Sequence, residues 1–186
     1  MRPKDVDFSS PYVMDDFLPP EEFETIRSLV CNETKDFSFR FFPHKYVSSP
    51  SELEDQSLRN DYWNWYGIHL LYNFDVPNSP YFESIYQLFI PRFKDLGMCE
   101  SLIRIKANFF PYTETLKEHH PHQDYPFFNT GAIYSLNTCD GFTRMADGSK
   151  VDSVANRIVF FDASSSHNST TTSDCAARYN INFNFK

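Results

Sequence analysis

The pattern of apolar and polar positions divides the chain into a helical first part and a strand-rich second part. Residues 8–14 are predicted to form a short strand. The segment Phe17-Leu18-Pro19-Pro20-Glu21-Glu22 then opens a helix, because proline is tolerated in the first turn and acidic residues favour the positive end of the helix dipole. Apolar residues follow at helical spacing, which predicts a helix with one face on a core: Phe23, Ile26, Leu29 and Val30.

A second long helix is expected to begin at Ser79-Pro80. Its apolar positions again share one face: Tyr81, Ile85, Leu88 and Phe89. Pro91 is expected to perturb the later part of this helix, because proline lacks the N–H that the helix needs. Gly97 is expected to end it.

The region between these helices has a weaker pattern. Residues 34–50 are irregular and rich in phenylalanine, and they are compatible with an edge strand. The segment Ser51-Glu52-Leu53-Glu54 has the form of a helix cap. An aromatic cluster follows at residues 61–66. We interpret its rings as packing a helical layer against a sheet, with a substrate-recognition wall as the alternative.

From Leu102 onward the alternation is typical of strands. Strands are predicted at residues 102–109, 131–137, 157–161 and 177–185, and a hairpin at residues 142–154 around the turn Asp147-Gly148. His122 to Asp124 is expected at the beginning or end of a further strand.

This order of elements predicts a single domain over residues 1–186, since a chain of this length can bury one core. The fold class is mostly β with flanking helices. We expect a double-stranded β-helix (jelly-roll) core at residues 101–186, with two N-terminal helices packed on one sheet. Residues 1–100 are expected to provide helical support and the aromatic segment.

Composition narrows the class of protein. The formal net charge of −8 makes nucleic acid and anionic membranes unfavourable partners. No apolar run approaches the roughly 20 residues of a membrane span, and the first residues do not have the pattern of a signal peptide. The four cysteines lie far apart without a Cys-x-x-Cys pair: Cys31, Cys99, Cys139 and Cys175. We therefore expect reduced cysteines and a cytoplasmic protein.

The candidate chemistry begins at His122-Gln123-Asp124. On an extended backbone, His122 and Asp124 lie on the same face, because side chains alternate with a period of two. His167 adds a second imidazole, and two histidines with one carboxylate form the facial triad that holds ferrous iron. Arg178, in the alternating last strand, suits a dicarboxylate cosubstrate, because its planar guanidinium binds a carboxylate in a bidentate way.

These residues resemble the 2-oxoglutarate- and iron-dependent oxygenases, in particular the prolyl-4-hydroxylase-like branch. The resemblance covers roughly residues 102–185. It rests on these pieces: Tyr112 ten residues before His122, His122-Gln123-Asp124, Ile133-Tyr134-Ser135-Leu136-Asn137, Arg157-Ile158-Val159-Phe160-Phe161 before His167, and Ala177-Arg178-Tyr179-Asn180-Ile181.

The resemblance implies a dioxygenase that uses Fe(II), 2-oxoglutarate and O2, with ascorbate as a reductant. Its substrate would be a protein, a peptide or a small molecule, and the reaction a hydroxylation of a C–H bond in a residue such as peptidyl proline. His122, Asp124 and His167 would bind the iron. Arg178 would bind the distal carboxylate of 2-oxoglutarate.

Further cosubstrate contacts are expected from four residues. Tyr112 matches a family tyrosine that hydrogen-bonds 2-oxoglutarate. Ser135 occupies a position at which hypoxia-sensing prolyl hydroxylases carry a tyrosine, and a serine is shorter. Asn108 and Asn180 complete the set. Asn180 shares its face of the last strand with Arg178, Asn182 and Asn184, a row of amides that fits a polar pocket better than a dry core.

Three alternatives remain open from the sequence. His120 is in phase with His122 and Asp124, although the i, i+2 spacing favours His122. A nucleic-acid dealkylase of the AlkB type has an Arg-x-Asn-x-Thr-x-Arg strand, which Arg178 to Asn184 resembles only in part, because Asn184 replaces the second arginine. A non-catalytic jelly-roll binding module is the third possibility.

Overall fold

The computed structural model describes residues 10–31, 36–43 and 63–186. The helix cap expected at residues 51–54 and the beginning of the aromatic cluster lie outside these ranges.

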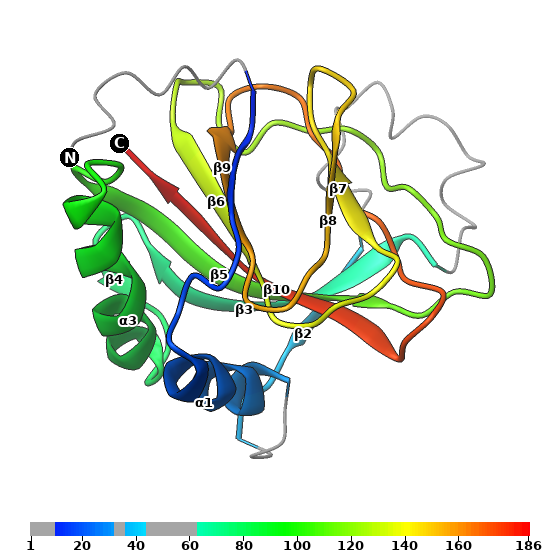
Figure 1. Cartoon of the computed structure of the whole chain (residues 1–186), viewed down its shortest axis with the longest axis horizontal. Coiled ribbons are helices and arrows are strands. Elements are labelled where there is room, and N and C mark those ends of the chain that lie inside the picture. Colours follow the sequence, from blue (N-terminus) through cyan, green and yellow to red (C-terminus); the bar gives the residue numbers. More distant parts are fainter. Residues whose placement is uncertain (1–9, 32–35, 44–62) are drawn as a thin grey trace.

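The described chain is built on one curved antiparallel sheet of eight strands (Figure 1). Its neighbouring strands, in spatial order, are β1 (Tyr12–Met14), β9 (Ile158–Asp162), β6 (Thr130–Ser135), β10 (Ala177–Phe185), β5 (Leu102–Pro111), β3 (Trp65–Asn73) and β2 (Arg40–Pro43), and β4 (Val76–Pro77) also pairs with β3. A second, two-stranded sheet consists of β7 (Phe142–Arg144) and β8 (Lys150–Asp152). This mostly β architecture agrees with the predicted fold class.

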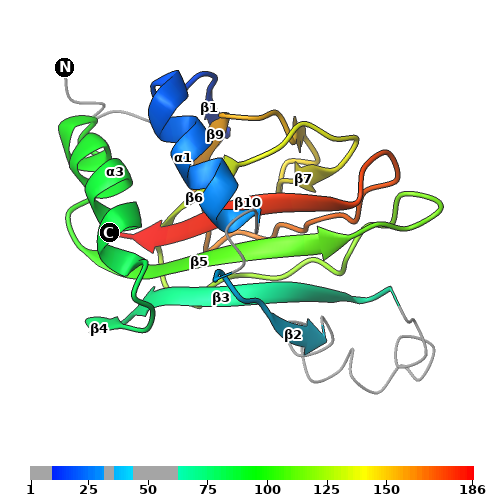
Figure 2. The same ribbon diagram turned by 90° about the horizontal axis from the view of Figure 1, so that it is seen from below.

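The helices are α1 (Pro20–Val30) and α3 (Phe82–Asp95). Both lie against the outer side of the large sheet, whereas β7 and β8 face its inner side (Figures 1 and 2). α1 begins at the second proline of the predicted opening and has Glu21 and Glu22 in its first turn. Neither helix is long and apolar enough to cross a membrane.

Alternation along β10 separates two environments. From Tyr179 onward the odd-numbered residues of β10 point toward the helices and join the main core: Tyr179, Ile181, Phe183 and Phe185. The even-numbered residues point to the inner side and are all polar: Arg178, Asn180, Asn182 and Asn184. The last strand therefore supplies hydrocarbon to one face of the sheet and the polar groups of a site to the other.

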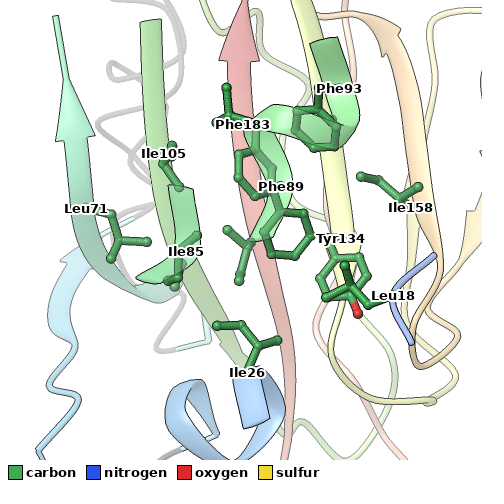
Figure 3. Close-up of a cluster of buried hydrophobic side chains, with 14 of the residues drawn as sticks. Leu18, Ile26, Leu71, Ile85, Phe89, Phe93, Ile105, Tyr134, Ile158 and Phe183 are labelled. Carbon is green, nitrogen blue, oxygen red and sulfur yellow. The ribbon is translucent and has the colours of Figure 1, made fainter. Parts of the chain in front are cut away.

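Aromatic rings fill the helix side (Figure 3). Phe89 of α3 lies 4.8 Å from both Tyr134 and Phe183, measured between ring centroids. Phe93 meets Phe160 at 5.3 Å in an edge-to-face arrangement. Each fully buried ring contributes about 1.5–3 kcal/mol through apolar burial. This packing gives the polar inner face a rigid support.

The hydroxyl of Tyr134 and the segment before α1 meet at Asn156. Asn156 Oδ1 accepts hydrogen bonds from the Leu18 N–H at 2.9 Å and the Tyr134 hydroxyl at 2.6 Å, and its Nδ2 donates to the Leu18 carbonyl at 2.8 Å. Asn156 adopts a φ of 62°, a conformation that asparagine tolerates better than most residues. One amide thus satisfies the polar groups where the N-terminal segment crosses the core.

Strand β3 was not predicted, and a bulge explains why. The register against β5 shifts between Leu70 and Tyr72, so that the neighbouring residues Leu71 and Tyr72 both contact the helix-side core. A bulge breaks the period of two on which a strand prediction depends. The end of the aromatic cluster, Trp65 and Tyr66, is therefore part of a sheet strand.

Helix α3 also continues through Pro91 to Asp95. Ile90 and Phe93 on either side of the proline are buried, and this packing offsets the lost hydrogen bond. As predicted, Gly97 follows the end of the helix, with a φ of 70° and its N–H donating to the Lys94 carbonyl at 2.8 Å.

Candidate functional site

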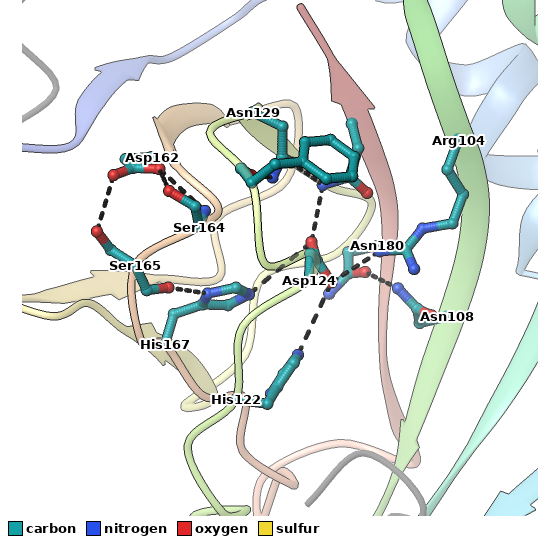
Figure 4. Close-up of polar contacts among 12 residues, drawn as sticks. Arg104, Asn108, His122, Asp124, Asn129, Asp162, Ser164, Ser165, His167 and Asn180 are labelled. Atoms are coloured by element: carbon teal, nitrogen blue, oxygen red, sulfur yellow. Dashed lines mark hydrogen bonds and ion pairs between the residues drawn. The ribbon is translucent and has the colours of Figure 1, made fainter. Parts of the chain in front are cut away.

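Three possible metal ligands converge on the inner side of the sheet (Figure 4). They are His122, Asp124 and His167, whose donor atoms all lie within 4.8 Å of one another. The Nε2 atom of His122 is 3.9 Å from Asp124 Oδ1, and the Nε2 atom of His167 is 4.0 Å from Asp124 Oδ2. Both imidazoles thus present Nε2 toward the same carboxylate.

The backbone holds these ligands outside the regular strands. His122 and His167 form an isolated antiparallel bridge, and the Asp124 N–H donates to the Ala163 carbonyl at 3.0 Å. His122 to Asp124 is therefore held by individual hydrogen bonds and not by a continuous ladder.

The ring of His167 has a defined tautomer. Its Nδ1 lies 3.0 Å from the Ser165 carbonyl, which can only accept, so Nδ1 carries the proton. The lone pair of Nε2 is then left on the side of Asp124, as a metal ligand requires. Asp162 fixes this loop by accepting a hydrogen bond from the Ser165 hydroxyl at 2.8 Å.

The Asp124 carboxylate is oriented by two strands. Its Oδ1 accepts from Arg104 Nη2 of β5 at 2.7 Å, and its Oδ2 accepts from Asn184 Nδ2 of β10 at 2.9 Å. Burial alone would raise the pKa of Asp124, but the neighbouring cations Arg104 and Lys106 outweigh it and hold the pKa well below its usual range. Asp124 is therefore ionised, as a metal-binding carboxylate must be.

Arg178 is 1% exposed and lies on the same inner face. Its Nη1 donates to the Phe142 carbonyl at 2.8 Å and its Nη2 to the Thr143 hydroxyl at 2.9 Å, while its Nε has no partner among the described residues. No described carboxylate pairs with this cation. Burial lowers the pKa of Arg178 to about 10, so the guanidinium is charged at neutral pH and fits an anion supplied by a ligand.

Gly141 leaves the space that Arg178 occupies. A Cβ atom at this position would lie 2.7 Å from Arg178 Cδ and 2.9 Å from the Thr171 carbonyl oxygen. A side chain at position 141 would therefore push the guanidinium away from Phe142 and Thr143. The glycine fixes where the buried cation lies.

A cavity with a free volume of about 40 Å³ opens beside the triad. Its polar lining includes the triad imidazoles, three amides and an ammonium: His122, His167, Asn108, Asn180, Asn182 and Lys106. Asn108 Nδ2 donates to Asn180 Oδ1 at 2.9 Å. The Oδ1 atoms of Asn108 and Asn182 have no partner among the described residues, so the lining presents hydrogen-bonding atoms to whatever enters.

The structure brings most of the predicted residues together. Asn108 and Asn180 line the cavity together with His122 and His167. The group of possible metal ligands includes His122 and not His120. Tyr112 is 53% exposed, and Ser135 is buried opposite Asn180 on β6. Neither is part of the cavity lining, and their cosubstrate contacts remain predictions.

The polar residues of the site that were missed from the sequence include Arg104, Lys106 and Thr143. Arg104 and Lys106 alternate in β5 with Ile103 and Ile105, and this parity places them on the face of Asn108. This alternation is visible in the sequence, but a strand face that carries charged residues is normally exposed to solvent.

A second group of possible metal ligands consists of Cys139, Asp174 and Cys175. Its donors already bond within the protein. The Asp174 carboxylate accepts the Asp140 N–H and the Thr172 hydroxyl, and the Cys175 thiol donates to the Ala177 carbonyl at 3.1 Å. These bonds give the group a structural role in the loop before β10.

Comparison with known proteins identifies the fold. No family model and no curated protein sequence matches the chain, whereas many solved structures do. A prolyl-4-hydroxylase of Pseudomonas putida has a TM-score of 0.55 at 15% identity, with 95% of this chain and 92% of that chain covered. A Trichoplax adhaerens prolyl hydroxylase, in complex with a peptide fragment of hypoxia inducible factor, has a TM-score of 0.58 at 16% identity, with 94% and 83% covered.

The third example is HygX from Streptomyces hygroscopicus, solved with nickel, 2-oxoglutarate and hygromycin B. It has a TM-score of 0.57 at 12% identity, with 96% of this chain and 83% of that chain covered. At these identities the likeness concerns the fold. The chain shares its fold with solved 2-oxoglutarate-dependent oxygenases, prolyl hydroxylases among them.

Proposed function

We propose that this protein is a 2-oxoglutarate- and Fe(II)-dependent dioxygenase that hydroxylates a C–H bond. The observation that carries the proposal is the combination of the converging donors of His122, Asp124 and His167 with Arg178, a buried cation on the same inner face that has no carboxylate partner among the described residues. A dry core has no use for either feature, because buried charges are unfavourable without partners.

The donor set fits a ferrous ion. Two imidazole Nε2 atoms and one ionised carboxylate form the facial arrangement typical of non-haem iron oxygenases. His122, Asp124 and His167 would hold the ion, which would supply oxygen activation when bound. The Ser165 carbonyl and the Asn184 amide orient two of these ligands.

The remaining residues of the inner face position and shield the cosubstrate. Arg178 binds the distal carboxylate of 2-oxoglutarate through its charge, while Phe142 and Thr143 hold the guanidinium in place. The ring of Phe110, 5.4 Å from the guanidinium carbon, covers the cation from solvent. The paired residues Asn108 and Asn180 lie along the strands between Arg178 and Asn184, the residue that holds Asp124, and would supply amide groups there.

For the prime substrate we propose a peptidyl residue such as proline. Support comes from the fold shared with prolyl hydroxylases, which is an analogy. The same fold is found in HygX, solved with the small molecule hygromycin B, so small-molecule substrates belong in the same screen. Peptides and free amino acids should be tested for a mass gain of one oxygen atom.

The test of the oxygenase proposal is anaerobic binding of Fe(II) and 2-oxoglutarate. The parent protein is expected to develop the weak visible charge-transfer band of an iron-bound 2-oxo acid, and His167→Ala is the matched negative control. The proposal fails if the folded parent protein binds Fe(II) but shows neither this band nor any affinity for 2-oxoglutarate.

A further inference from the structure

Lys106 is a buried cation that the triad and Arg178 do not explain. It lies on β5, is 8% exposed and lines the cavity beside His122 and His167. Its ammonium lies 5.7 Å from the centroid of the Tyr66 ring. Among the described residues, no hydrogen bond or ion pair satisfies it.

Such a position is costly for a lysine. Burial, reinforced by repulsion from Arg104, lowers the pKa of Lys106 to about 7. Asp124 attracts the ammonium, but its carboxylate is already hydrogen-bonded to Arg104 and Asn184. A methionine would fill the same space without the cost of burying a charge. We therefore look for a function that needs a cation at this position.

The register of the sheet places Lys106 relative to Arg178. On β10, Arg178 is opposite Phe110 and Asn182 is opposite Lys106. These two pairs are four residues apart along the strand, about 13 Å at the usual rise. The next inward pair, Arg104 and Asn184, is the one that holds Asp124. Lys106 therefore lies toward the metal-ligand end of the inner face and Arg178 toward the opposite end.

The charges on this face point to a dianion. Arg104 pairs with Asp124 at 2.7 Å, which leaves Lys106 and Arg178 as two cations without a described carboxylate partner. A ligand with one carboxylate at each end would neutralise both. The free volume of about 40 Å³ is room for roughly three water molecules, so a five-carbon dicarboxylate requires lining side chains to move. Lys106 has the most rotatable bonds in the lining.

We propose that Lys106 is a second anchor of the cavity, whose ammonium binds the carboxylate at the metal end of a 2-oxo dicarboxylic acid while Arg178 binds the distal carboxylate. This inference rests on the proposed function, since it assigns a further contact to the same cosubstrate. In this role, Lys106 would favour 2-oxo acids by binding the carboxylate next to their oxo group.

The test compares Lys106→Met with Lys94→Met, the replacement of an exposed lysine on α3. Calorimetry on anaerobic, Mn(II)-loaded protein measures the affinity for 2-oxoglutarate and for 2-oxopentanoate, which lacks the distal carboxylate. Lys106→Met is expected to weaken both ligands about ten- to hundred-fold, the usual effect of losing a charged hydrogen bond. Arg178→Ala is expected to weaken 2-oxoglutarate only, and Lys94→Met neither.

Thermal unfolding separates an anchoring role from a structural one. An unpaired buried cation predicts that Lys106→Met melts above the parent protein, and Lys106→Gln serves as a second neutral variant if Lys106→Met does not fold. Parent affinity for 2-oxoglutarate in either variant, or a lowered melting temperature with lost binding, would overturn the inference. A parent protein that does not bind 2-oxoglutarate at all would instead refute the proposed function.

Discussion

His122 and His167 bond to each other twice through their backbones: each N–H donates to the other's carbonyl at 2.9 Å. In an antiparallel pair of this kind the two side chains leave the backbone on the same side, and the imidazole centroids are 4.6 Å apart. Two ligands that are distant in the sequence are thus fixed relative to each other by the main chain, before any metal is considered.

The choice of histidine can be tested by metal binding. His122→Ala is expected to abolish tight binding of Co(II), because the facial set loses one of its three donors, whereas His120→Ala should bind like the parent protein. The visible absorption of bound Co(II) measures both. Loss of binding in His120→Ala with retention in His122→Ala would mean that the ligand set is displaced by two residues.

Arg178 governs the affinity for the cosubstrate. In Arg178→Ala the distal carboxylate is buried without its ion pair, which typically costs about 3–5 kcal/mol and lowers affinity by two or more decades. Arg178→Lys should fall between, because lysine keeps the charge but loses the bidentate geometry. Calorimetric titration with 2-oxoglutarate gives the values, and unchanged affinity in Arg178→Ala would place the carboxylate elsewhere.

Asn184 should tune the metal site without touching the metal. Its Nδ2 holds both Asp124 Oδ2 and Asn129 Oδ1 at 2.9 Å. Asn184→Ala is therefore expected to weaken metal affinity about 10–100-fold, as the loss of a ligand-orienting hydrogen bond usually does. Asn182→Ala is the matched control on the same strand face, because Asn182 makes no hydrogen bond to Asp124. Equal effects of the two changes would contradict the orienting role.

The buried ammonium of Lys106 predicts a pH-dependent stability. Its pKa is about 7 in the folded protein, against 10.5 for an unperturbed lysine, the value expected in the unfolded chain. Between these values the unfolded chain binds more protons, so this group makes the folded protein more stable as the pH rises. Groups facing it are Arg104, Asp124 and Tyr66 from the sheet and site, together with the two imidazoles of the cavity.

The measurement is the difference in the free energy of unfolding between Lys106→Met and the parent, without metal, at several pH values. The advantage of the variant should be largest below pH 7 and should shrink toward pH 10.5. A difference that does not depend on pH would show that Lys106 titrates normally.

The sequence singles out His122, Asp124 and His167, which the structure brings together, because metal chemistry restricts ligands to few residue types. His122 and Asp124 are two residues apart, and this spacing is informative in any extended backbone. The alternation in residues 177–185 also predicts both faces of β10, since a period of two survives unless a bulge interrupts it. Both features depend only on residues that are close together in the chain, and they can therefore be predicted from the sequence.

Other features depend on tertiary structure. The bulge at Leu71 hid strand β3, and the packing of Phe93 carried helix α3 past Pro91. The alternation of Arg104 and Lys106 does not identify them as site residues, because only the assembled fold shows that the face of β5 they share is covered. Burial of a charge is a property of the neighbours and not of the residue.

The ion pair between Arg104 and Asp124 has a consequence for how the protein is loaded. Many small metal-binding domains remain unfolded until the ion arrives, because the free energy of metal binding drives their folding. Here the carboxylate has its own internal counter-ion, with Arg104 Nη2 at 2.7 Å, and the guanidinium also lies 5.1 Å from the ring of Tyr125. The Asp124 carboxylate is therefore already paired with a cation before any metal binds, and a bound ion would add a second positive charge beside it.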